Sequence, residues 1–201
     1  QYLTFDKRLN CYILQIPLVC SLYDSTQNEF YNKIFLKKNE RSKRFLEKKD
    51  FKSFILLYEK PYRASTLLLL KDLIDDVEYW RLLRSVWVET EMQSSQLEVW
   101  LSLFTAEKGN RGEFMTDKDI DIYQKLPKKF KIYRGYRGKK YKKGISWTID
   151  YSVAEFFANR FAAETKIEGK IISKTVYKND IFAYTDYRGE KEIIYLKGFI
   201  K

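Results

Sequence analysis

Residues 131–161 read KIYRGYRGKKYKKGISWTIDYSVAEFFANRF, and the fold of the C-terminal half of the chain depends on them. A short apolar run ends in an Arg-Gly pair at 134–135, and a lysine-rich loop then leads to Ser-Trp-Thr at 146–148. Asp150 is a typical helix N-cap residue, and apolar residues recur after it at helical spacing up to about residue 164. A strand, a loop, a second strand and a helix are therefore predicted in that order.

The sequence RGEKEIIYL at 188–196 begins another apolar run and places Glu190 and Glu192 two residues apart. Residues at positions i and i+2 of a strand share one face, so both carboxylates are expected on the same side. Short runs rich in Ile, Val, Tyr and Thr, separated by Gly and Asn-Asp turn signals, predict further strands. The expected strand ranges are 130–133, 145–149, 169–177, 181–184 and 192–200.

The first part of the chain has a helical character. Residues 1–25 are ambiguous, because apolar runs with β-branched residues are interrupted by a proline. After them, Ser/Thr-x-x-Glu capping boxes predict helix starts at Thr26 and Ser95, and Pro61 is expected to end a helix. Tryptophans at helical spacing in this part are expected in its core.

A change of character divides the chain. The stretch AEKGNRGEF at 106–114 has the glycines, asparagine and alternating charges of a linker. We therefore predict a mostly α-helical cap or partner-binding region over 1–105 and a separate core over 106–201. Thr116 is expected to cap a short helix at the start of that core. Helices followed by strands place the whole chain in the α+β class.

The composition excludes several classes of site. With 201 residues, of which 45% are hydrophobic, the chain can bury a substantial core. It has no histidine, so Ser-His and Cys-His catalysis and His-based zinc sites are excluded. Cys11 and Cys20 are the two cysteines; reduced thiols are favoured, and a disulfide between them stays open.

Nothing in the sequence predicts a membrane protein. No apolar run reaches the roughly 20 residues that a membrane span needs. A cytoplasmic site of action is therefore expected. The apolar run at 11–23, preceded by a Lys-Arg pair, loosely imitates a signal peptide and leaves secretion open.

In their order and spacing, the YRG, SWT and RGEKE motifs and the helix after SWT resemble the Arg-Ser-Glu class of mono-ADP-ribosyltransferases. The resemblance covers about residues 115–201 and implies a mixed or antiparallel β-sandwich fold. It also implies that NAD is the co-substrate and that no metal is needed. The implied reaction transfers ADP-ribose from NAD to a macromolecular acceptor and releases nicotinamide.

The resemblance gives three residues catalytic roles. Glu192 would bind the ribose 2′-hydroxyl and stabilise the positive charge that develops on the ribose. Ser146 would hold Glu192 in place and line the nicotinamide ribose. Glu190 would orient or deprotonate the incoming nucleophile.

The resemblance also implies a set of NAD-binding residues. Arg134 offers a bidentate fork for the pyrophosphate, and Gly135 would bind the nicotinamide amide through its main chain. Ser146 and Thr148 would line the site. An aromatic residue should stack on nicotinamide; Phe157 is the candidate we name, with Phe156 and Tyr151 as alternatives.

The acceptor stays open between two classes. In the resembled enzymes a Glu at the position of Glu190 usually accompanies protein arginine targets, and Tyr187 and Arg188 would contact the target. Residues 122–149, however, carry ten basic residues and no acidic one, which attracts phosphates. A nucleic-acid strand could follow 137–143, with its bases stacked on neighbouring tyrosines. The basic residues are Lys125, Lys128, Lys129, Lys131, Arg134, Arg137, Lys139, Lys140, Lys142 and Lys143.

Other functions remain as alternatives to a protein-arginine transferase. The enzyme could act on RNA or DNA bases, or it could be an NAD glycohydrolase with water as its nucleophile. A non-catalytic, basic nucleic-acid-binding module, in which the two glutamates have no role, is a further alternative. Because a free transferase would poison its own cell, we expect a toxin or effector, with an antitoxin or chaperone as a partner.

Overall fold

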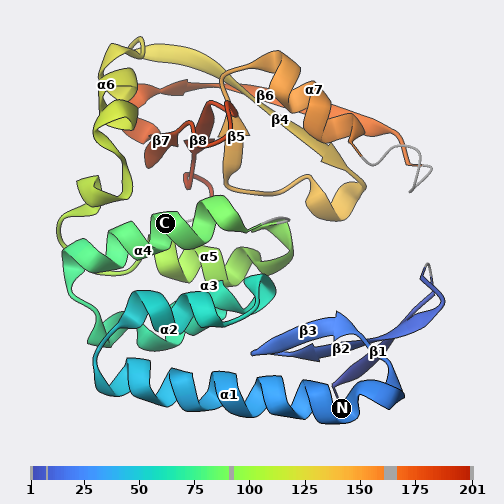
Figure 1. Cartoon of the computed structure of the whole chain (residues 1–201). Coiled ribbons are helices and arrows are strands. Elements are labelled where there is room, and N and C mark those ends of the chain that lie inside the picture. The colour runs from blue at the N-terminus through green and yellow to red at the C-terminus, as the bar shows by residue number, and fades with distance from the viewer. Residues whose placement is uncertain (1, 8, 91–92, 161–166, 200–201) are drawn as a thin grey trace. The chain divides into compact units, whose positions relative to one another are not determined.

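The computed structural model describes residues 2–7, 9–90, 93–160 and 167–199 of the chain (Figure 1). The chain divides into two compact units, Gln1–Thr90 and Glu91–Lys201. The division falls earlier than the sequence-based boundary at 105/106, so helix α5 (Leu97–Phe104) belongs to the second unit. The reason is aromatic packing, because the ring of Phe104 lies 5.4 Å from that of Phe114 and 5.1 Å from that of Phe182.

The first unit begins with a three-stranded antiparallel sheet. Its strands are β1 (Leu3–Asp6), β2 (Cys11–Ile16) and β3 (Val19–Leu22), in the order β1-β2-β3. Pro17 lies in the turn between β2 and β3, where its missing N–H removes no ladder hydrogen bond. The structure thus resolves the ambiguity of these residues in favour of strands, and both cysteines are free thiols.

Helices make up the rest of the first unit. They are α1 (Asn28–Glu47), α2 (Phe51–Leu57), α3 (Lys60–Leu70) and α4 (Asp76–Glu89), with short 3-10 turns at Ser25–Gln27 and Lys71–Leu73. The tryptophans of α4 are buried as predicted: Trp80 is 1% exposed and Trp87 is fully enclosed.

Two helix-end predictions in this unit are wrong. The hydroxyl of Thr26 does not cap a helix; it donates to the carboxylate of Asp24, which also accepts from the Thr26 amide at 2.9 Å. Asp24, two residues before Thr26, thus accepts the Thr26 amide that a capping box would direct to Glu29. Helix α1 begins only at Asn28. Pro61 lies in the first turn of α3, where a missing N–H costs nothing, and does not end a helix.

Two helix starts in the second unit were also predicted from the sequence. A 3-10 turn, Gln93–Gln96, precedes α5, and Gln96 occupies the N-cap position that was predicted for Ser95. Another 3-10 turn, Arg111–Phe114, leads to α6 (Asp117–Lys125). Thr116 caps α6 as predicted, with Asp119 as the reciprocal partner of the capping box.

A five-stranded sheet forms the centre of the second unit. Its strands are β4 (Lys129–Arg137), β5 (Ser146–Thr148), β6 (Gly169–Tyr177), β7 (Ala183–Thr185) and β8 (Glu192–Ile194). The order is β6-β4-β5-β8-β7, and all neighbours are antiparallel. The α+β class is confirmed. The described residues of this unit form one sheet, so the second sheet of a sandwich is not among them.

Short helical segments connect these strands. A 3-10 turn, Lys139–Tyr141, lies between β4 and β5, and another, Lys178–Asp180, follows β6. Helix α7 (Tyr151–Asn159) starts after β5, with Asp150 as its N-cap, as predicted. The continuation of this helix to about residue 164 falls partly on 161–166, which lie outside the described residues. The last strand, β8, is shorter than the predicted range 192–200.

The two faces of this sheet pack against different helices. One face carries the core residues Ile132, Trp147 and Ile193, against which Ile122 and Tyr123 of α6 pack. Trp147 is 6% exposed, which confirms the prediction that it belongs to the core. Helix α7 packs on the opposite face, beside β4 and β6 (Figure 1).

Two glycines allow α7 to approach the sheet closely. A Cβ on Gly135 would overlap the carbonyl oxygen of Ala154 and lie 2.6 Å from the amide nitrogen of Ala158. A Cβ on Gly169, which pairs with Arg137 of β4, would lie 2.5 Å from the carbonyl carbon of Ala158. Any larger residue at either position would push the helix away from the strands.

Candidate active site

Ser146 and Glu192 meet on neighbouring strands of the second sheet. In the register of β5 and β8, Thr148 lies opposite Glu192, so Ser146 is two residues away on the same face. The Ser146 hydroxyl donates a hydrogen bond to Oε1 of Glu192. Glu192 is only 8% exposed, so its carboxylate is held in one position within a low-dielectric surrounding.

Arg134 contacts the same serine through the main chain. Its Nη1 donates to the carbonyl oxygen of Ser146 at 2.6 Å, and its Nη2 donates to that of Tyr141 at 3.3 Å. Gly144 lies directly on the guanidinium, since a Cβ there would be 2.5 Å from Cζ of Arg134. The arginine therefore fastens the loop before β5 to β4.

The charge of Arg134 is only partly compensated. Burial lowers the pKa of the guanidinium to about 10, and the carboxylate of Glu192 acts in the opposite direction. The side chain therefore remains charged at neutral pH. Within the described part of the chain, its buried Nε has no hydrogen-bond partner, so one donor of the guanidinium is unused.

The sheet register places Arg134 and Glu192 on opposite faces of the second sheet. Tyr133 pairs with Thr148, which in turn pairs with Glu192, so these three residues share one face. Arg134 follows Tyr133 and therefore leaves the strand toward the other face. The structure links Arg134 to Glu192 through Ser146, whose carbonyl binds the arginine and whose hydroxyl binds the glutamate.

A buried threonine on the third neighbouring strand was missed by the sequence reasoning. Thr185 of β7 lies opposite Glu192 and is 1% exposed. Its Oγ1 is buried and has no hydrogen-bond partner among the residues that the structure describes. A buried hydroxyl without a partner costs free energy, so its position beside Glu192 marks it as a candidate ligand contact. The pattern Ala-Tyr-Thr carries no signal that could have identified it.

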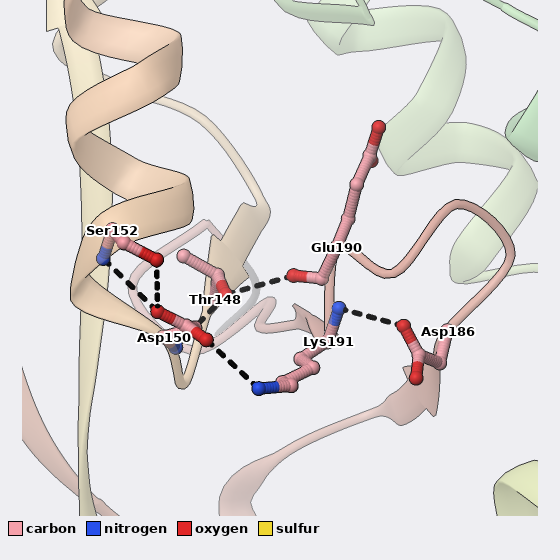
Figure 2. A network of polar contacts seen from close by, with 6 residues as sticks. All are labelled: Thr148, Asp150, Ser152, Asp186, Glu190 and Lys191. Carbon is pink, nitrogen blue, oxygen red and sulfur yellow. Dashed lines mark hydrogen bonds and ion pairs between the residues drawn. The ribbon is translucent and has the colours of Figure 1, made fainter.

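A polar network fixes the turn that carries Glu190 (Figure 2). The hydroxyl of Thr148 donates to the carbonyl oxygen of Glu190 at 2.8 Å and accepts from the amide of Asp150 at 3.0 Å. The amide of Lys191 donates to Oδ1 of Asp186 at 3.1 Å. Thr148 thus supports the site through the main chain on both sides of it.

Lys191 and Asp150 join this turn to the start of α7. Nζ of Lys191 lies 2.8 Å from Oδ2 of Asp150, and Asp150 also accepts hydrogen bonds from the amide and hydroxyl of Ser152. These contacts lower the pKa of Asp150 to about 2, with the Lys191 hydrogen bond as the largest cause. The carboxylate is therefore ionised, and the ion pair intact, at neutral pH.

The prediction that Glu190 and Glu192 share a strand face is wrong. Strand β8 begins at Glu192, and Lys191 before it has a φ of 45°, in the left-handed region. Because that conformation interrupts the alternation of a strand, Glu190 does not follow the i, i+2 rule. Figure 2 shows its carboxylate extending away from the Thr148, Asp150 and Lys191 side chains.

Burial raises the pKa of Glu190, and the nearby Arg188 and Arg160 partly oppose that effect. A half-buried carboxylate with a raised pKa is better suited to accept a proton than an exposed one. Glu190 thus combines partial burial with a raised pKa, on the turn that precedes Glu192.

Asp119 is a second residue that the sequence reasoning missed. It is 3% exposed; Oδ2 binds the capping residue Thr116, and Oδ1 accepts a hydrogen bond from the amide of Asp186 at 3.1 Å. The buried carboxylate thus ties the start of α6 to the turn that carries Glu190. Its place three residues after Thr116, where a capping box has its acidic partner, was an available signal.

The remaining predicted site residues lie at the surface or under α7. Tyr187 is 55% exposed, and the guanidinium of Arg188 lies 5.7 Å from its ring. Phe157 is half-buried, with Arg160 at 5.6 Å from its ring, whereas Phe156 is exposed. Gly135 is covered by α7, so the structure gives it a packing role.

The described residues contain no group of three or more His, Cys, Asp or Glu side chains that could hold a metal ion. They also form no helix that is long and apolar enough to cross a membrane. Comparison of the chain with models of known protein families, with curated proteins and with solved structures finds no match.

Proposed function

We propose that this chain is an NAD-dependent mono-ADP-ribosyltransferase with the ADP-ribosyltransferase fold, which transfers ADP-ribose from NAD to a macromolecule and releases nicotinamide. The observation that carries the proposal is the hydrogen bond from Ser146 to Glu192, with Arg134 bound to the carbonyl of the same serine. These residues come from β4, β5 and β8, which are consecutive strands of the sheet. Their identities and chain order match the motif that the sequence resembles.

Glu192 has the properties that the reaction needs at the ribose. As the bond between C1′ and the nicotinamide nitrogen breaks, positive charge develops on the sugar, and a fixed carboxylate stabilises it. Ser146 holds Oε1 of the carboxylate, and we assign the 2′-hydroxyl of the ribose to the other oxygen. Preorganisation by Ser146 avoids the cost of turning the carboxylate during the reaction.

The buried donors around the pair fit a bound dinucleotide. The Nε of Arg134 and Oγ1 of Thr185 are buried without partners in the described part of the chain. Thr185 lies opposite Glu192 in the sheet, and the Arg134 side chain binds the carbonyl oxygen of Ser146. A charged guanidinium suits a pyrophosphate, and a hydroxyl suits a ribose or amide oxygen. Binding these groups would remove the energetic penalty of the unpaired donors.

We assign Glu190 the role of the base that takes the proton from the acceptor. The nucleophilic atom of the acceptor forms the new bond to C1′, the bonding electron pair leaves with neutral nicotinamide, and the acceptor proton passes to Glu190. Its raised pKa supports this role, as does its place on a braced turn. The exposed Tyr187 and Arg188 on the same turn supply contacts to a large substrate.

The test is incubation with labelled NAD and a bacterial lysate, followed by digestion with protease or with nuclease. The wild-type chain is compared with Glu192→Gln, which keeps the Ser146 hydrogen bond and removes the charge. Glu155→Gln is the matched control, because Glu155 is an exposed glutamate on α7. Label that depends on Glu192 and not on Glu155 supports the transferase.

Other outcomes separate the alternatives. Free ADP-ribose without labelled macromolecules would indicate a glycohydrolase. No loss of NAD from a folded protein, with or without lysate, would refute the enzymatic proposal and leave a binding module.

We further propose a toxin or effector role that acts in the cytoplasm, with an antitoxin or chaperone as the neutralising partner. A transferase active on a cellular macromolecule would slow the growth of a host that expresses it. Growth arrest with the wild-type chain and normal growth with Glu192→Gln is the expected result. Normal growth with an active, well-expressed wild-type chain would contradict this role.

A further inference from the structure

The face of the second sheet that carries α7 is only partly covered by it. Helix α7 lies over the end of β4 and β6 that contains Gly135 and Gly169. At the other end of the same face, Lys129, Lys131, Ser173 and Thr175 are exposed. Cross-strand partners share a face, and the pairs here are Lys129 with Tyr177, Lys131 with Thr175, and Tyr133 with Ser173.

Two lysines and three tyrosines lie along this area, which we call the lysine–tyrosine face (Lys129, Lys131, Tyr133, Tyr151 and Tyr177). Nζ of Lys129 lies 5.5 Å from the ring of Tyr177, and Nζ of Lys131 lies 5.5 Å from the ring of Tyr133. The ring of Tyr133 meets that of Tyr151, at the start of α7, edge to face at 5.4 Å. Tyr177 and Tyr151 are 57% and 53% exposed.

The charges on and around this face favour an anionic partner. No acidic residue lies among the exposed members of the two strands there. Asp150, next to Tyr151 in the sequence, is already bound to Lys191 and Ser152. Glu155 is exposed one turn further along α7. Exposed lysine–ring contacts contribute little, about 0.5–1 kcal/mol each. The ammonium groups can therefore move to a phosphate and leave the rings open to a stacked base.

The Ser146–Glu192 pair is on the same side of the sheet as the lysine–tyrosine face. Tyr133, Thr148 and Glu192 are aligned across β4, β5 and β8 on the same side of the sheet. Two strand spacings separate Tyr133 from Glu192, which is about 10 Å. A base stacked near Tyr133 therefore lies within one nucleotide or so of the proposed catalytic carboxylate.

We infer that the lysine–tyrosine face binds single-stranded nucleic acid, and that nucleic acid is consequently the acceptor class of the transferase. The rings of Tyr177, Tyr133 and Tyr151 supply stacking surfaces, Lys129 and Lys131 bind phosphates, and the Ser173 and Thr175 hydroxyls offer further hydrogen bonds. The acceptor part of this inference depends on the proposed function, whereas the binding part does not.

Binding is measured with no NAD present, so that it can succeed or fail independently of catalysis. Fluorescence anisotropy is recorded with labelled single-stranded RNA and DNA of about 16 nucleotides, at the upper end of site sizes for small single-strand-binding domains. A duplex of the same sequence is the comparison. We expect the single strands to bind and the duplex to bind more weakly, since paired bases cannot stack on tyrosines.

The tyrosine variants test stacking. Tyr177→Ala should weaken binding by roughly five-fold to a hundred-fold, the range expected for one lost base–aromatic stack. Tyr177→Phe keeps the ring and should restore binding. Tyr12→Ala is the control, because Tyr12 is 52% exposed in the first unit. Equal affinity of Tyr177→Ala and wild type would overturn the inference.

The lysine variants test the phosphate contacts. Lys129→Gln with Lys131→Gln should reduce the slope of log K against log salt by about 1.4, or about 0.7 for each lost contact to a single strand. The matched control is Lys118→Gln with Lys125→Gln, which makes the same charge change on α6, on the opposite side of the sheet. Equal effects of both pairs would mean non-specific attraction and overturn the inference.

Further measurements test where nucleic acid binds and whether it is the acceptor. The binding part of the inference would stand even if the chain consumed no NAD, whereas the acceptor part would then fall with the proposed function. Loss of binding from Lys139→Gln with Lys140→Gln, but not from the lysine–tyrosine face variants, would move the nucleic acid to the loop and contradict it. ADP-ribose label confined to protein would contradict the acceptor part of the inference, whether or not the chain binds nucleic acid.

Discussion

The hydroxyl of Ser146 donates a hydrogen bond to the carboxylate of Glu192 across neighbouring antiparallel strands. Because both residues are on strands rather than on loops, their relative position follows from the register of the sheet. Replacing Glu192 by Gln keeps a hydrogen-bond acceptor for Ser146 and removes only the negative charge. This substitution therefore tests electrostatic catalysis with little disturbance of the fold.

We expect Glu192→Gln to lower the rate of NAD consumption by about 10²–10³-fold, the usual effect of removing one preorganised stabilising group. The rate is measured by the release of nicotinamide. Thermal unfolding of both proteins provides the control for folding. A rate within a factor of a few of wild type would show that Glu192 does not carry the reaction.

Glu190 should set the acidic limb of the pH–rate profile. A base acts only when ionised, and burial raises the pKa of Glu190 above its usual value of 4.5. The rate should therefore rise with pH through a midpoint above 4.5. The Glu190→Gln variant should lose this limb along with most of its transfer activity. An unchanged profile in that variant would exclude Glu190 as the base.

Substitution of Gly135 should destabilise the second unit. In Gly135→Ala, the new Cβ would overlap the Ala154 carbonyl and lie 2.6 Å from the Ala158 nitrogen, so α7 has to move. We expect a loss of about 3 kcal/mol in the free energy of unfolding, as for severe over-packing. Gly112→Ala is the control, since a Cβ there meets nothing within 4 Å. Denaturant unfolding measures both, and equal midpoints would contradict the packing role.

Asp119 should hold the turn that carries Glu190. Asp119→Ala removes the acceptor of the Asp186 amide and half of the Thr116 capping box, which should cost about 1–3 kcal/mol in stability. It should also speed hydrogen exchange at the Asp186 amide. Asp117→Ala, an exposed change in the same helical turn, provides the comparison. Slow exchange at Asp186 in the Asp119 variant would contradict this bracing role.

The Asp150–Lys191 ion pair should make stability dependent on acidic pH. The folded state lowers the pKa of Asp150 from 3.8 to about 2, so its contribution is complete above about pH 4. It is lost as the pH falls through 2, where the carboxylate becomes protonated in both states. Asn remains a good N-cap and cannot ionise.

The difference in unfolding free energy between wild type and Asp150→Asn should therefore shrink between about pH 4 and pH 2. Denaturant unfolding at a series of pH values measures it. High salt should reduce the difference at pH 7, because the pair is partly exposed. A difference that does not change with pH would mean that the ion pair contributes nothing.

Local patterns in the sequence determined many elements of this protein. The caps at Thr116 and Asp150, the strand at 169–177 and the burial of Trp147 were predicted, because capping and periodicity depend only on nearby residues. The capping prediction failed at Thr26, because the Thr26 amide donates to the carboxylate of Asp24. The three-stranded sheet of the first unit could not be decided locally, since its runs suit a strand or a buried helix.

The candidate site, in contrast, depends on contacts between segments that are far apart in the sequence. Motif order identified Ser146 and Glu192, but only the register of β5 and β8 brings their side chains together. The left-handed backbone of Lys191, the packing of α7 on Gly135 and the unused hydroxyl of Thr185 are set by contacts between distant segments. A sequence specifies which groups are available, whereas their distances, burial and pKa values arise only when remote segments pack together.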